Sequence, residues 1–176
     1  MLAAAGLCAW LAACTSAPGI HLPQARTQAS QINVYHPRQN RDVAVTVVRY
    51  LPERTAPAQP AVLLLSGCNG SFGTAARALT QQLLARGVIV AEVKSIETFG
   101  NSCSGNPPRL TGAGRAAHAF EARKHLVEAG LARVDNVALL GFSHGGWTIL
   151  HASHMDAGHG FVVGNQPPFA AAVAFY

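Results

Sequence analysis

Residues 134–150 read VDNVALLGFSHGGWTIL and place a glycine-rich turn between two hydrophobic segments. The apolar run 137–140 before the turn is typical of a strand buried on both faces of a parallel sheet. The turn carries the pattern G-x-S-x-G, with Ser143 between Gly141 and Gly145. A sharp strand-to-helix turn strains the backbone at the serine, and flanking glycines leave room where the chain crowds its neighbours. The sequence therefore predicts that the Ser143 side chain stands exposed on such a turn.

Outward from this motif, strand and helix patterns alternate along the chain from about residue 31 onward. Apolar runs predict further strands at 61–65, 88–93 and 170–175, and an opening antiparallel pair is expected at 32–35 and 43–51. Helices are expected between residues 74 and 87, from about 112 to 129, and from about 144 to 155. This βαβαβ alternation predicts an α/β protein with a doubly wound, mostly parallel sheet.

The helix patterns also predict caps and a buried face. We expect Thr74 to cap the first helix and Gly87 to end it. In the second helix the expected buried stripe consists of Ala113, Ala117, Phe120 and Val127.

A second glycine-rich turn, residues 66–70, follows the expected strand 61–65. Where a nucleophile turn is present, a loop at this place supplies one oxyanion-hole N–H, and the residue after the nucleophile supplies the other. We expect these donors to be the backbone N–H groups of Cys68 and His144, the latter at the positive end of a helix. A plain turn between strand and helix is the alternative for 66–70.

Four stretches together resemble the α/β-hydrolases, and within them the dienelactone hydrolase family and its exported relatives. They are LLLSGCNG at 63–70, GRAAHAFEARKHL at 114–126, VDNVALLGFSHGGWTIL at 134–150 and AAAVAFY at 170–176. The resemblance covers about residues 43–176 and implies cleavage of a small-molecule ester or related acyl compound through an acyl-enzyme, without a cofactor. Ser143 stands where dienelactone hydrolase has cysteine, which implies a serine esterase. Ser66-Gly67 replaces the common His-Gly, so we expect this loop to be held differently.

The other two triad residues are not evident. The fold's order is serine, then acid, then histidine, but the only acid after Ser143 is Asp156. We expect six of the eight histidines to be ordinary helix or loop residues: His118, His125, His144, His151, His154 and His159. The expectation is a partial α/β-hydrolase domain over 32–176, lacking its last strands. Without a base, residues 1–176 should show little esterase turnover, and the bare sheet edge at 170–175 should favour association.

The N-terminus has the features of an export signal. Residues 2–13 form an apolar run, shorter than the roughly 20 residues of a membrane span and typical of a secretory signal. Its end, Leu-Ala-Ala-Cys at 11–14, resembles a bacterial lipobox. The resemblance implies a signal peptide at 1–13, a lipid-modified Cys14, a tether at 14–31 and an envelope location with a membrane anchor. No Lys or Arg precedes the run, so an ordinary cleaved signal or a cytosolic N-terminal helix stay open.

The cysteines indicate which covalent or metal-binding features the protein could have. In an oxidising compartment Cys68 and Cys103 would remain as an even pair, which predicts a disulfide, with unpaired thiols as the alternative. The sequence contains no CxxC spacing that would indicate a metal site.

The thirteen Lys and Arg residues are scattered, so we expect no nucleic-acid partner despite a net charge of +5. Two other functions stay open, a peptidase of related fold and a non-catalytic envelope lipoprotein that binds a ligand.

Overall fold

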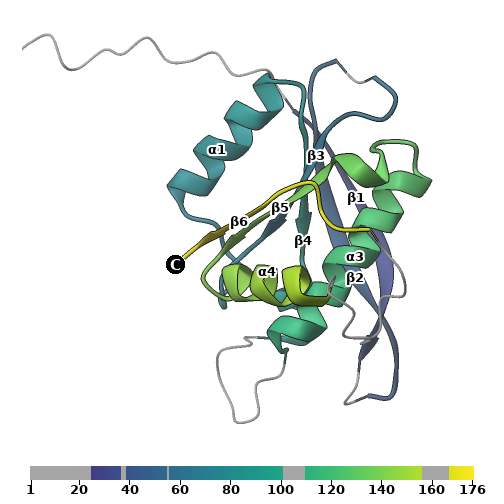
Figure 1. Ribbon diagram of the computed structural model, residues 1–176, viewed down its shortest axis with the longest axis vertical. Coiled ribbons are helices and arrows are strands. Elements are labelled where there is room, and N and C mark those ends of the chain that lie inside the picture. Colours follow the sequence, from purple (N-terminus) through teal and green to yellow (C-terminus); the bar gives the residue numbers. More distant parts are fainter. Residues whose placement is uncertain (1–24, 37–38, 55, 101–109, 156–166) are drawn as a thin grey trace, which may run out of the picture.

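A six-stranded sheet runs through the protein in the order β1-β2-β4-β3-β5-β6 (Figure 1). The computed structural model describes residues 25–36, 39–54, 56–100, 110–155 and 167–176. The strands are β1 (Arg26–His36), β2 (Arg41–Leu51), β3 (Ala61–Leu65), β4 (Ile89–Val93), β5 (Val137–Phe142) and β6 (Ala172–Phe175). The helices are α1 (Thr74–Ala85), α2 (Ser95–Phe99), α3 (Gly112–Glu128), the 3-10 turn η1 (Val134–Asn136) and α4 (His144–Met155).

The sheet is mixed, with a parallel half that confirms the predicted α/β class. Strand β3 pairs in parallel with β4 and with β5, and β5 pairs in parallel with β6. Strand β2 pairs antiparallel with both β1 and β4. Every residue of β4 is buried, as its apolar sequence predicts for a strand covered on both faces.

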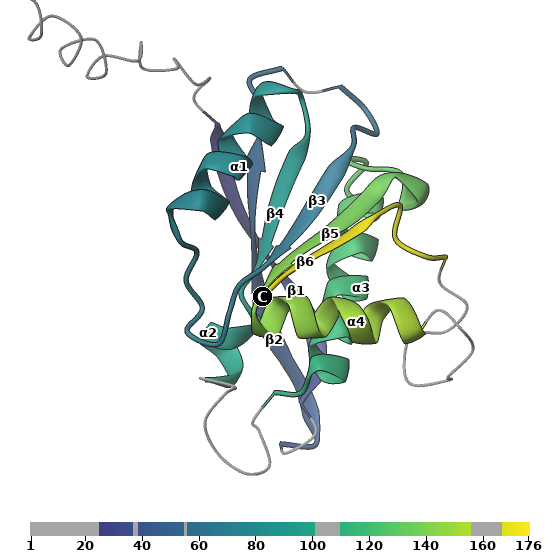
Figure 2. The same ribbon diagram turned by 60° about the vertical axis from the view of Figure 1, so that its left-hand side comes forward.

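Helices cover both faces of the sheet, with α1 on one face and α3 and α4 on the other (Figure 2). The larger hydrophobic core lies under α3 and α4 and includes Leu63, Ala119 and Ile149. The smaller core contains Leu84 of α1 and Val90 of β4. The two-sided covering explains why the central strands lack an apolar–polar alternation.

Strand β1 begins six residues earlier than the sequence indicates, at Arg26 and not at Ile32. It pairs with β2 from Arg26 opposite Leu51 to His36 opposite Arg41, so the tether expected over 14–31 cannot extend beyond residue 25. Residues 26–31 of β1 are mostly polar, and all except Ser30 are exposed. They therefore carry no hydrophobic pattern that would have marked a strand.

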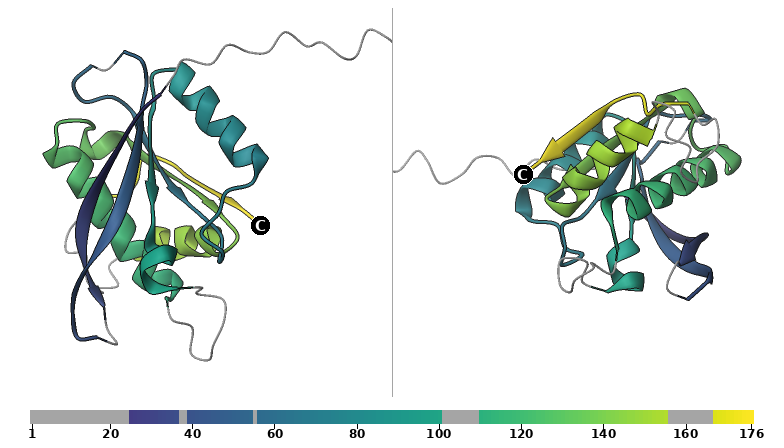
Figure 3. Two further views of the ribbon diagram at one scale, coloured as in Figure 1. Left: turned by 180° about the vertical axis from the view of Figure 1, so that it is seen from behind. Right: turned by 60° about the horizontal axis from the view of Figure 1, so that its bottom comes forward.

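Strand β6 begins at Ala172, two residues after the expected start, and lies at the opposite margin of the sheet from β1 (Figure 3). In the described sheet β6 pairs with β5, and Phe175 lies opposite Phe142. Val173 and Phe175 remain exposed in the described structure.

The predicted end of α1 is confirmed, whereas its predicted cap is wrong. Thr74 is the first helical residue, and the cap position is Gly73, which makes no side-chain cap hydrogen bond. Gly87 has φ of +77°, and its N–H donates to the Leu84 carbonyl while the Val88 N–H donates to the Leu83 carbonyl. This pair of bonds ends a helix with a left-handed residue, a conformation that glycine adopts without strain.

Helix α3 turns a different face to the sheet than predicted. Of the expected stripe only Phe120 is fully buried, whereas Ala113, Ala117 and Val127 are partly exposed. Two arginines, Arg115 and Arg123, are completely buried instead. Because charged residues are normally assigned to solvent, a periodicity argument selects the wrong face of this helix.

Arg123 ties α3 to the segment before β6. Its Nη1 donates to the carbonyls of Pro167, at 2.6 Å, and Pro168, at 3.1 Å. The guanidinium also lies over the rings of Phe120 and Phe169. These bonds satisfy a charge that would otherwise be costly to bury.

Several predictions concern residues outside the described part of the chain: the signal at 1–13, the lipidation of Cys14, and the positions of Cys103, Asp156 and His159. The disulfide between Cys68 and Cys103 therefore stays a prediction, as do export and lipid anchoring. Among the helices that the structure describes, none is long and apolar enough to cross a membrane.

Candidate active site

Ser143 lies on the turn between β5 and α4 and has φ of +52°. Ser143 is exposed, whereas Phe142 before it is partly buried and His144 after it is fully buried. The Ser143 carbonyl accepts the first bond of α4, from the Trp147 N–H at 3.0 Å. The Ser143 N–H donates to the Phe175 carbonyl of β6 at 2.7 Å. The backbone is thus held on both sides in a left-handed conformation that serine rarely adopts.

Glycines on both sides of Ser143 are required by contact with backbone atoms. A Cβ at position 141 would lie 2.4 Å from the carbonyl carbon of Gly145. A Cβ at position 145 would lie 2.2 Å from the Leu65 carbonyl oxygen of β3. The start of α4 therefore packs directly against the end of β3, as the glycine spacing indicates.

Strain at Ser143 gives the first testable prediction. We expect Ser143→Gly to be more stable than Ser143→Ala by about 1 kcal/mol, because only glycine adopts φ of +52° without a Cβ penalty. Urea unfolding of the two variants measures the difference. Equal free energies of unfolding for the two variants would show that a Cβ at position 143 causes no backbone strain.

The loop that follows β3 lies beside Ser143. A Cβ at Gly67 would be 3.6 Å from the Ser143 Cβ and 3.7 Å from the Phe142 carbonyl oxygen. The loop is a tight turn, in which the Gly70 N–H donates to the Gly67 carbonyl at 3.2 Å and Gly70 has φ of +75°. The two glycine-rich turns predicted from the sequence are therefore neighbours, and Cys68 lies in the loop next to the serine.

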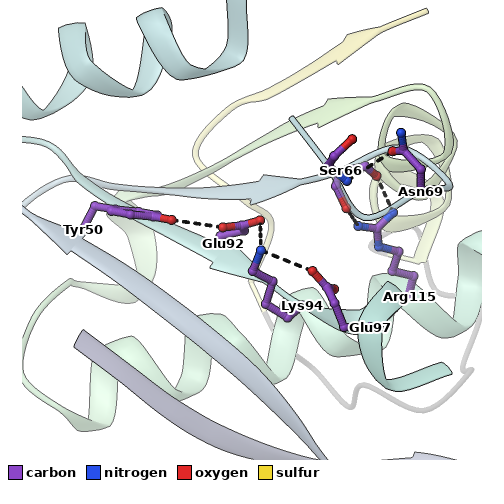
Figure 4. Close-up of polar contacts among 8 residues, drawn as sticks. Tyr50, Ser66, Asn69, Glu92, Lys94, Glu97 and Arg115 are labelled. Carbon is purple, nitrogen blue, oxygen red and sulfur yellow. Dashed lines mark hydrogen bonds and ion pairs between the residues drawn. The ribbon is translucent and has the colours of Figure 1, made fainter. Parts of the chain in front are cut away.

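Arg115 of α3 holds this loop, and sequence analysis did not identify it. Its Nη1 donates to the Ser66 carbonyl at 2.6 Å and its Nη2 donates to Ser66 Oγ at 3.0 Å (Figure 4). The one sequence signal was Ser66 itself, since its departure from the common His-Gly predicted that the loop is held differently.

The histidine next to the serine points into the protein. His144 is buried; its Nδ1 lies 3.3 Å from Arg115 Nη1 and its Nε2 lies 3.2 Å from the Leu110 carbonyl oxygen. Burial, reinforced by the Arg115 charge, lowers the pKa of His144. A neutral imidazole directed away from Ser143 agrees with the expectation that this side chain is not the catalytic base.

Four other described histidines lie on α3 or α4. His118 is buried with Nδ1 3.0 Å from Ser95 Oγ, and His125 Nε2 lies 2.8 Å from Ser30 Oγ. His151 packs against Trp147, and His154 is exposed in the last turn of α4. Among the described residues, no histidine forms a hydrogen bond with the Ser143 side chain.

A second polar network lies at the end of β4. Glu92, the buried charge within this apolar strand, accepts from Tyr50 Oη at 3.2 Å and contacts Lys94 Nζ (Figure 4). Lys94 also pairs with Glu97 at 3.2 Å. Burial and the Glu92 charge raise the pKa of Tyr50. A Cβ at Gly70 would lie 3.4 Å from the Glu97 carboxylate, so this network borders the loop beside Ser143.

This sheet order, the helices on both faces and the strained serine after β5 are those of the α/β-hydrolase fold. Solved structures with this fold match the chain, although no protein-family model and no curated protein sequence does.

The matches include enzymes of several kinds. The chain is similar to a thermostable carboxylesterase cloned from a metagenomic library, with TM-score 0.54 and 21% identity over 80% of this chain and 45% of the esterase. It is similar to a puromycin-hydrolysing peptidase of Mycobacterium tuberculosis, with TM-score 0.50 and 25% identity over 73% of this chain and 20% of the peptidase. A protein of Klebsiella pneumoniae assigned as a dienelactone hydrolase gives TM-score 0.54 and 16% identity over 85% of this chain and 72% of that one. The chain thus spans less than half the length of the first two, and the likenesses show the fold.

Proposed function

We propose that this chain forms the nucleophile-bearing part of a serine hydrolase that cleaves an ester or related acyl bond through an acyl-enzyme. The observation that carries the proposal is Ser143, exposed at φ of +52° on the turn from β5 to α4. A polar side chain held in a strained conformation at the end of a central strand is a feature of nucleophile turns.

In the proposed reaction Ser143 Oγ attacks the carbonyl carbon of the substrate, and the alcohol leaves as the acyl-enzyme forms. The negative oxygen of the tetrahedral intermediate would accept from the N–H groups of Cys68 and His144. His144 begins α4, where the first N–H groups have no acceptor within the helix and the helix dipole favours negative charge. A triad histidine, which the described histidines do not supply, would take the Ser143 proton and pass it to the leaving alcohol, and water would then hydrolyse the acyl-enzyme.

The dienelactone hydrolase type is the finer form of this proposal. It is supported by the resemblance of residues 43–176 and by the similar structure from Klebsiella pneumoniae. A peptidase is the second candidate, because the similar structures include the puromycin-hydrolysing peptidase. The serine turn serves both reactions, since ester and amide cleavage share the tetrahedral intermediate.

Active-site labelling tests the proposal in the protein as its own cell makes it. We expect a fluorophosphonate probe to label the wild-type protein on the peptide that contains Ser143, and we expect Ser143→Ala to abolish labelling. The matched control is Ser153→Ala, which removes an exposed serine of the same helix and should leave labelling intact.

Wild-type protein that is folded yet unlabelled would contradict the proposal and favour a binding module. For a labelled protein, matched p-nitrophenyl ester and p-nitroanilide substrates separate the two candidates. An esterase should turn over the ester alone, whereas a peptidase should also cleave the anilide.

A further inference from the structure

The side chain of Arg115 is completely buried between α3 and the two glycine-rich turns. A buried guanidinium is costly unless its donors are matched to acceptors. Two of its nitrogens reach both acceptors of one residue, the carbonyl and the hydroxyl of Ser66, at 2.6 and 3.0 Å. This two-point contact fixes the direction of the chain where it leaves β3.

The same guanidinium also sets the proton position on His144. Because Arg115 can only donate, the His144 Nδ1 at 3.3 Å from Nη1 must accept. The ring proton then resides on Nε2, which donates to the Leu110 carbonyl at 3.2 Å. Hydrogen bonds therefore run continuously from Leu110 through His144 and Arg115 to Ser66.

This chain of bonds joins the two segments that would form the oxyanion hole. Ser66 lies two residues before Cys68, and His144 follows Ser143 directly. At Gly67, between Ser66 and Cys68, the loop comes close to the serine, since a Cβ there would lie 3.6 Å from the Ser143 Cβ. Two donors act on one developing oxyanion only if their separation is held to a fraction of an ångström.

We propose that Arg115 is a positioning residue that holds the Cys68 and His144 amides at the separation an oxyanion requires. This inference rests on the proposed serine hydrolase function. Arg115 itself would touch neither substrate nor reacting atoms, since its donors face Ser66 and His144 inside the protein.

The chain offers a matched control on the same helix. Arg123 is equally buried and donates to two backbone carbonyls, but those belong to Pro167 and Pro168, ahead of β6. A purely structural role for Arg115 predicts that Arg115→Met and Arg123→Met behave alike. A positioning role predicts that only Arg115→Met impairs the chemical step.

The test measures the hydrolysis of p-nitrophenyl acetate by the folded protein, in the form in which its own cell produces it. We expect Arg115→Met to lower kcat about 100-fold with little change in KM, comparable to the loss of an oxyanion donor. Binding of a phenylboronic acid, which forms a tetrahedral adduct with the serine, should weaken in parallel. Arg123→Met should leave both kcat and boronate affinity within about twofold of the wild type.

Two milder variants keep the test decisive if Arg115→Met does not fold. Arg115→Lys retains the charge but not the two-point contact, and Ser66→Ala removes only the acceptor of Nη2, so each should lower kcat about tenfold. Normal kcat in these folded variants, or equal losses in the Arg115 and Arg123 variants, would overturn the positioning role while Ser143 labelling still supports the hydrolase. Absence of Ser143 labelling in the wild type would overturn both.

Discussion

Gly145→Ala is expected to destabilise the protein by about 4 kcal/mol or more, enough to leave little folded material. The new Cβ would lie 2.2 Å from the Leu65 carbonyl oxygen and 2.9 Å from that of Ser66. These are backbone atoms at the end of β3, and β3 cannot move because it pairs with β4 and β5 on either side. Helix propensity alone predicts the opposite sign, since alanine in a helix is favoured over glycine by about 1 kcal/mol.

Urea unfolding, or the soluble yield if the variant precipitates, measures this effect. Gly73→Ala is the control, because a Cβ there meets nothing within 4 Å and φ is already −69°. We expect it to change stability by less than about 1 kcal/mol. A Gly145→Ala protein as stable as this control would mean that β3 and α4 do not approach as closely as described.

Acid sensitivity should depend on His118. Burial, aided by the charges of Arg115 and His36, lowers the pKa of His118 from 6.5 to about 3 in the folded protein. Between these values the unfolded chain binds a proton that the folded protein does not, so the free energy of unfolding falls as the pH falls through this range. From about pH 7.5 to about pH 5 the expected loss from this one group is about 2 kcal/mol.

The variant His118→Asn removes the titrating ring while keeping a polar group near Ser95 Oγ, which lies 3.0 Å from the native Nδ1. We expect the loss of stability between the two pH values to shrink by about 2 kcal/mol, whatever the variant's stability at neutral pH. Exposed His154 provides the control, and His154→Asn should retain the wild-type pH slope. An unchanged slope in His118→Asn would show that this imidazole is not held neutral by burial.

Strand positions in the parallel half could be predicted because their signal is local. The apolar runs at β3 and β5 coincide with the observed strands to within two residues, since burial on both faces demands continuous hydrophobicity. The start of β1 was missed because Arg26–Gln31 belongs to an edge strand, and most of its side chains face solvent. The composition of such a segment does not distinguish a strand from a flexible tether.

The turn at Ser143 was equally predictable, because a glycine two residues before the serine and another two residues after it indicate that backbone atoms approach closely there. Arg115 was not predictable in the same way. Its partners Ser66 and His144 lie 49 and 29 residues away, and a charged residue in a helix of small residues normally faces water.

The sequence by itself determined the α/β class, the order of the strands and the three longer helices, and the sharp turn at Ser143, because each depends on neighbours within a few residues. Only the tertiary structure decided which face of α3 is buried, that Gly67 lies beside Ser143, and that one guanidinium joins the two turns. Those features arise when distant segments pack together, and the acceptors that make a buried arginine tolerable exist only once β3, α3 and α4 have met.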